Sequence, residues 1–145
     1  MPETERERTA RYAARDVVDK LGVKPGDAVL FAGATRDPDL IARIRRKAGR
    51  APARASEKAD VVVFWPRGGT EVTTTLRQLR ERVSEAGGIW VITAKRNKER
   101  AGRPYLGDDV MALGLAAGLV DNKVCAVSEI DTAIRFVIRR ADRRA

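Results

Sequence analysis

The chain has 145 residues, a formal net charge of +9, no histidine and one cysteine. A chain of this length forms one domain, and its 43% hydrophobic content is ordinary for a globular protein. The absence of histidine excludes Ser-His-Asp and Cys-His nucleophile activation and histidine-ligated metals, and a single cysteine excludes an internal disulfide and a cysteine-rich zinc site.

The positive charge has two explanations at this point. Seven of the 29 basic residues are lysine and the rest are arginine. Such a surplus permits phosphate or nucleic-acid binding, but an arginine- and alanine-rich composition is also what a GC-rich genome produces. No run approaches the roughly 18 apolar residues of a membrane span. Residues 1–8 are charged, are expected to be flexible and do not resemble a signal peptide, so a cytoplasmic location is expected.

The first half of the chain predicts a helix, a strand and a second helix. Apolar residues recur at helical spacing over 9–21, and Gly22 follows as a natural stop. Residues 28–32 form a first buried strand. Asp37-Pro38 then opens a helix, with an acidic N-cap and proline at the first helical position. Residues 49–59 form an irregular connector, in which 50–55 allow a short edge strand.

The centre of the chain predicts a strand–helix–strand unit. Residues 61–66 are uninterruptedly apolar, which is typical of a parallel strand buried on both faces. Thr70 is expected to cap a helix that runs to about residue 86, and a second buried strand follows at 89–93. The helix carries a core stripe at steps of four and three residues: Val72, Leu76, Leu79, Val83 and Ala86.

The last third predicts a loop, a helix and a hairpin. Residues 95–104 form a polar loop, and Asp108 or Asp109 caps a small-residue helix. Strands at 123–128 and 132–139 are joined by three residues, so they must be antiparallel.

The expected fold class is therefore α/β, a three-layer Rossmann-like domain over residues 9–140, with a basic tail at 141–145. Its sheet has five strands in the order 1-2-3-5-4. If the crossovers are right-handed, the three intervening helices share one face and residues 9–21 cover the other.

The C-terminal hairpin and the opening at residues 21–30, followed by Gly33, resemble the class I S-adenosylmethionine-dependent methyltransferases. More narrowly, residues 60–67, 88–95 and 116–119 resemble a family of small bacterial, mainly actinobacterial, proteins catalogued as a domain of unknown function. This second resemblance covers about residues 21–139, and it implies the fold but no activity.

The chain departs from the methyltransferase pattern in two places. Of the glycines that follow the first strand in that family, only Gly33 remains. The resemblance also implies an acidic residue for the cofactor ribose at the end of a further strand, but residues 49–59 leave no room for that strand and its crossovers. We therefore expect the adenosine half of the cofactor site to be missing and no cofactor to bind.

The candidate site lies where the parallel strands end. Ligands of open α/β sheets bind beyond the carboxyl ends of the strands, and all three ends carry basic residues here. The first two loops also lead into helix N-termini, which favour anions. Solvated loop charges remain the alternative explanation. The predicted ligand-binding residues are Gly33, Arg36, Trp65, Arg67, Gly68, Lys95 and Arg96.

Other candidates have plainer structural explanations, and no catalytic or metal-binding residue is predicted. Trp65 packs in the core or stacks on a base at the rim. Gly68-Gly69 forms a plain turn or a phosphate-binding turn, but the Gly-Lys-Ser/Thr of a P-loop is absent. The basic C-terminal end is solvated or contacts nucleic acid. Cys125 is an inert filler, and Tyr105 is the one plausible acid–base phenol near the site.

Three functions remain open. The first is a non-catalytic module that binds a nucleotide or nucleic acid. The second is a shortened methyltransferase that uses Gly33 and Asp60 while a partner completes the cofactor site. The third is an adaptor or homo-oligomer, in which the first strand or the hairpin pairs with another chain.

Overall fold

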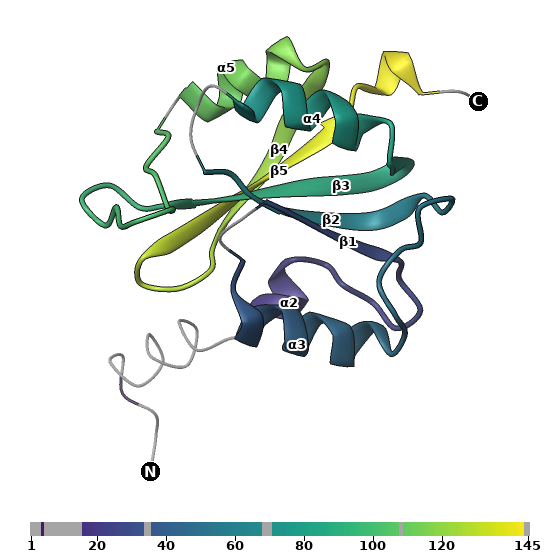
Figure 1. Cartoon of the computed structure of the whole chain (residues 1–145), viewed down its shortest axis with the longest axis horizontal. Coiled ribbons are helices and arrows are strands. Elements are labelled where there is room, and N and C mark those ends of the chain that lie inside the picture. The colour runs from purple at the N-terminus through teal and green to yellow at the C-terminus, as the bar shows by residue number, and fades with distance from the viewer. Residues whose placement is uncertain (1–3, 5–15, 34–35, 68–70, 108, 144–145) are drawn as a thin grey trace.

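The computed structural model describes residues 4, 16–33, 36–67, 71–107 and 109–143, which form a five-stranded sheet between two helical layers (Figure 1). The elements follow in the order α2 (Val17–Lys20), β1 (Val29–Gly33), α3 (Pro38–Ala48), β2 (Ala59–Trp65), α4 (Val72–Arg80), β3 (Val83–Ala94), α5 (Asp109–Ala116), β4 (Leu119–Ala126), β5 (Asp131–Ile138) and the 3-10 turn η2 (Arg140–Asp142).

The sheet order β1-β2-β3-β5-β4 confirms the predicted topology. The first three strands are parallel, and β5 runs antiparallel to both β3 and β4. Alternate residues of β2 face opposite layers: Val61, Val63 and Trp65 pack on one side, and Val62 and Phe64 on the other. All five are buried, which confirms the interpretation of this run as a central strand.

The prediction that three helices share one face is wrong for α3. Helices α2 and α3 cover one face, while α4 and α5 cover the other (Figure 1). The face under α2 and α3 carries Phe31, Trp65 and Trp90, and Leu40 and Ile44 of α3 belong to the same buried cluster. The β1–α3–β2 and β2–α4–β3 connections step the same way across the sheet with their helices on opposite faces. The two crossovers therefore have opposite hands, and one departs from the right-handed rule.

Several predicted boundaries differ from the structure, and β3 begins at Val83 instead of residue 89. Helix α4 ends at Arg80 instead of about residue 86, because Val83 belongs to β3 and pairs with Ala59. Strand β4 begins at Leu119, four residues before the expected start. Residues 50–55 form no strand, and Ala53 makes a single backbone hydrogen bond to Val29 (2.8 Å).

The predicted start of α3 is confirmed. The Asp37 side chain accepts a hydrogen bond from the Leu40 N–H (3.1 Å), and Pro38 is the first helical residue. Helix α5 begins at Asp109. The expected helix start at 9–15 and the proposed caps Thr70 and Asp108 lie outside the described residues.

Candidate functional site

The carboxyl ends of β1, β2 and β3 lie at one edge of the sheet, but they are not level. Gly33 pairs with Trp65, and Phe64 pairs with Val91, so β3 continues two residues beyond the end of β2. At about 3.3 Å per residue, β3 ends roughly 7 Å farther along the sheet. The cations that follow β3 therefore lie farther out than those that follow β1 and β2.

Gly33 has a structural role at this edge. Its φ is 99°, and a Cβ there would lie 2.0 Å from the carbonyl oxygen of Trp65. Only glycine permits this close approach of β1 to β2. The space beside Gly33 is thus filled by protein backbone.

Trp65 belongs to the core. Its side chain is 0% exposed and stacks on Phe31, with ring centroids 6.4 Å apart and planes inclined by 26°. The indole Nε1 has no hydrogen-bond partner within the described part of the chain. The structure therefore matches the core-packing interpretation, and it leaves no surface of this ring on which a base could stack.

Arg36, Arg67 and Lys95 carry charges that no described residue neutralises. The first two are exposed, Lys95 is half-buried, and none forms an ion pair with a residue that the structure describes. Arg36 turns back to donate from Nε to the Gly33 carbonyl oxygen (2.9 Å). Three cations thus follow three neighbouring strands, as the sequence predicts.

Arg96 is held by an aromatic neighbour. Its Nε and a terminal nitrogen donate to the Tyr105 hydroxyl oxygen at 3.3 and 3.2 Å, and its Cζ lies 5.7 Å from the centre of the ring. This cation–π contact fixes the guanidinium beside the phenol. Tyr105 consequently acts as a support for Arg96 in this arrangement.

The starts of α3 and α4 are occupied by the protein's own carboxylates. Asp37 accepts from the Leu40 N–H at the start of α3, and Glu71 accepts from the Arg67 N–H (3.2 Å) before α4. An external anion would meet these negative charges at both helix N-termini. The predicted contribution of these helix ends is therefore weak, and Gly68 lies outside the described residues.

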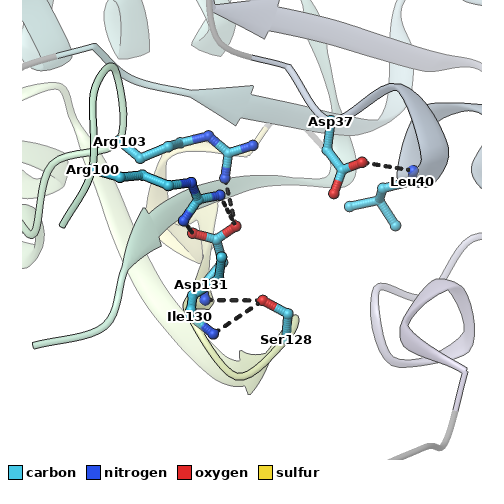
Figure 2. A network of polar contacts seen from close by, with 7 residues as sticks. All are labelled: Asp37, Leu40, Arg100, Arg103, Ser128, Ile130 and Asp131. Atoms are coloured by element: carbon cyan, nitrogen blue, oxygen red, sulfur yellow. Dashed lines mark hydrogen bonds and ion pairs between the residues drawn. The ribbon is translucent and has the colours of Figure 1, made fainter. Parts of the chain in front are cut away.

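A buried ion-pair network organises the loop after β3, and sequence reasoning missed it. Asp131 accepts from Arg103 at 2.5 Å and from Arg100 at 3.1 and 3.3 Å (Figure 2). Ser128 Oγ accepts from the backbone N–H groups of Ile130 and Asp131. Arg103 and Asp131 are 4% and 3% exposed. Two cations of the loop thus serve to fasten it to the β4–β5 turn, which no local spacing in the sequence indicates.

The described residues do not fit S-adenosylmethionine. The space beside Gly33 is filled, and residues 49–58 contain no helix or strand that could supply a ribose ligand. Asp60 accepts from the Ala28 N–H (2.8 Å) at the amino end of β2, five residues before Trp65. It is thus roughly 16 Å along the sheet from Gly33, and the two cannot hold one small group together. Across the part of the chain described, no cluster of three or more Cys, Asp or Glu residues suits a metal ion.

Comparison with known proteins gives a family and a fold. A family model described as "Protein of unknown function (DUF3052)" matches residues 18–140. No curated protein matches the sequence. No described helix is long and apolar enough to cross a membrane.

Similar solved structures include methyltransferases. A SAM-dependent methyltransferase from Aquifex aeolicus has a TM-score of 0.61 and 12% identity, covering 94% of this chain and 100% of that one. A TehB-like SAM-dependent methyltransferase from Corynebacterium glutamicum has a TM-score of 0.54 and 14% identity, with 93% and 95% covered. Magnesium protoporphyrin IX methyltransferase from Synechocystis PCC 6803, with bound SAM, has a TM-score of 0.55 and 12% identity, with 96% and 86% covered. At these identities the likeness shows the fold alone.

Proposed function

Because the chain belongs to the DUF3052 family of proteins of unknown function, we propose a function from its site alone: a non-catalytic Rossmann-like module that binds single-stranded nucleic acid at the carboxyl edge of its sheet. One observation carries this proposal. Arg36, Arg67 and Lys95 follow three neighbouring parallel strands, and none of them is paired with a described carboxylate. Each is a cation available to a phosphate group.

The arrangement favours a phosphate polymer over a single nucleotide. The cations are spread along an edge whose strands end at different levels, and the helix starts beside them already hold carboxylates. A mononucleotide needs an enclosed pocket with converging groups. A flexible strand can instead place successive phosphates on separate cations. Since Trp65 is buried and cannot stack on a base, the protein contacts the sugar–phosphate backbone of the nucleic acid. Little preference for the base sequence is therefore expected.

The test compares two triple variants of equal charge. Arg36→Ala/Arg67→Ala/Lys95→Ala removes three cations from the edge, and Arg45→Ala/Arg139→Ala/Arg140→Ala removes three exposed cations elsewhere. Fluorescence anisotropy with a labelled 12-nucleotide single strand measures affinity at one fixed salt concentration. The first variant should lose at least about tenfold, because direct phosphate contacts are lost, and the second should lose far less.

Thermal melts of both variants provide the folding control. Equal losses by two folded variants would show that the protein is merely cationic, and a larger loss by the second would overturn the proposed edge.

A shortened methyltransferase is the second candidate, because the similar structures are methyltransferases. A cofactor site that uses both Gly33 and Asp60 is not supported, since these two residues lie at opposite ends of the parallel strands. The isolated chain should therefore not bind S-adenosylmethionine at micromolar concentration in calorimetry. A one-to-one complex would favour the enzyme instead.

A further inference from the structure

A pocket of about 400 Å³ opens at the opposite end of the sheet, beside the amino ends of β2 and β3. It lies at an irregularity in the pairing of these strands. Ala59 pairs with Val83 and Val61 pairs with Gly88, so one residue of β2 stands opposite residues 84–87 of β3. The extra residues of β3 bulge out of the ladder, as the additional residues of a β-bulge do. Of the residues between these two pairs, Ser84, Ala86 and Gly87 line the pocket.

The pocket contains four cations and two carboxylates. The cations are Lys20, Lys24, Lys123 and Arg135, and none forms an ion pair with a described residue. Both carboxylates already accept from backbone groups: Asp27 from the Lys24 N–H (2.9 Å) and Asp60 from the Ala28 N–H (2.8 Å). The lining therefore has a formal surplus of two positive charges.

Arg135 is the most constrained of these cations. It lies on β5, and a Cβ on Gly88 of β3 would be 2.3 Å from its Nε and 2.6 Å from its Cζ. The guanidinium thus lies against the backbone of Gly88, and any larger residue at position 88 would require it to move. Burial lowers the pKa of Arg135, and the nearby Arg143 cation lowers it further.

Arg135 also faces a like charge across the hairpin. Its directly opposite residue on β4 is Lys123, and like charges opposite each other destabilise a strand pair. Within the described residues, the Arg135 side chain has no hydrogen bond or ion pair that offsets this repulsion or its partial burial. An anion between the two side chains would offset both costs.

We propose that this pocket binds a small phosphorylated molecule, with its phosphate held by Arg135 and Lys123. A guanidinium supplies paired N–H donors that match phosphate geometry, and the ammonium groups of the lysines add point charges. The volume suits a phosphate with a small organic group, as in ordinary ligand sites. This site lies at the other end of the strands from the nucleic-acid edge, so either one can fail without the other.

The test is an NMR titration with inorganic phosphate and with pyrophosphate. The backbone amides of Gly87 and Gly88 and the Arg135 Nε–H should shift along saturable curves. Gly88→Ala is the sharpest variant: it keeps every charge but places a Cβ where the guanidinium lies. This variant and Lys123→Gln/Arg135→Gln should each weaken binding at least about tenfold, because the bidentate contact is lost or displaced.

Arg45→Gln/Arg139→Gln removes two exposed charges away from the pocket and should leave the affinity nearly unchanged. Amide spectra establish that each variant is folded; if Gly88→Ala is not, the double variant decides. Equal weakening by the two double variants would overturn the site, as would unsaturable shifts for both anions or shifts centred on Arg67 and Lys95.

Discussion

Asp131 determines how many loop charges are available to a ligand. It is 3% exposed and accepts from both Arg100 and Arg103, so two cations of the loop after β3 are neutralised internally. Arg36, Arg67 and Lys95 have no such partner among the residues described. Fewer cations are therefore available to a ligand at the carboxyl edge than the basic composition of the loop suggests.

Asp131→Asn should destabilise the protein by about 3–5 kcal/mol, because it removes the buried carboxylate that pairs with Arg103. Urea denaturation measures the loss. Asp121→Asn on exposed β4 removes the same charge and should cost less than about 0.5 kcal/mol. Similar losses for the two variants would mean that the buried pair does not hold the loop.

At the scale of single residues, the sequence predicted the cations of the edge but not their neighbours. Basic residues after buried strands are visible directly, which is why Arg36, Arg67 and Lys95 were found. The contact of Arg103 with Asp131 joins residues 28 apart, and the packing of Trp65 on Phe31 depends on strand register. Neither leaves a local pattern in the sequence.

A substitution on helix α4 tests whether this helix packs on the sheet as part of the strand–helix–strand unit. Leu79 is 6% exposed on its core stripe, and Leu115 on α5 is 48% exposed. Leu79→Ala should cost about 2–5 kcal/mol, as truncation of buried leucines does. Leu115→Ala is the matched control and should cost well under 1 kcal/mol. A loss below about 1 kcal/mol for Leu79→Ala would contradict the packing of α4 on the sheet.

At the scale of elements, the order and type of strands followed from short apolar runs and turn residues, whereas two features did not. Val83 continues the helical spacing of α4 but pairs with Ala59, since periodicity alone does not separate a last helical turn from the first residue of a strand. The face that α3 covers depends on which side of the sheet carries Phe31, Trp65 and Trp90. A handedness rule that holds for most crossovers gave the wrong face here.

For the whole molecule, the net charge of +9 by itself favours salt-sensitive binding to nucleic acid. The affinity measured at one salt concentration is therefore only indirect evidence for a specific site. The two candidate anion sites lie at opposite ends of the parallel strands. Anion binding in the pocket therefore does not explain nucleic-acid binding at the carboxyl edge. A decisive measurement must show how many phosphates the residues of that edge contact.

The most direct measurement is the slope of log affinity against log salt concentration for a single-stranded oligonucleotide. Each neutralised phosphate contributes about −0.7 to this slope. If Arg36, Arg67 and Lys95 each hold a phosphate, their alanine triple variant should have a slope shallower by about 2, while the Arg45, Arg139 and Arg140 triple variant keeps the wild-type slope. The same change of slope in both triple variants, or a change in the second alone, would contradict a nucleic-acid site at the carboxyl edge of the sheet.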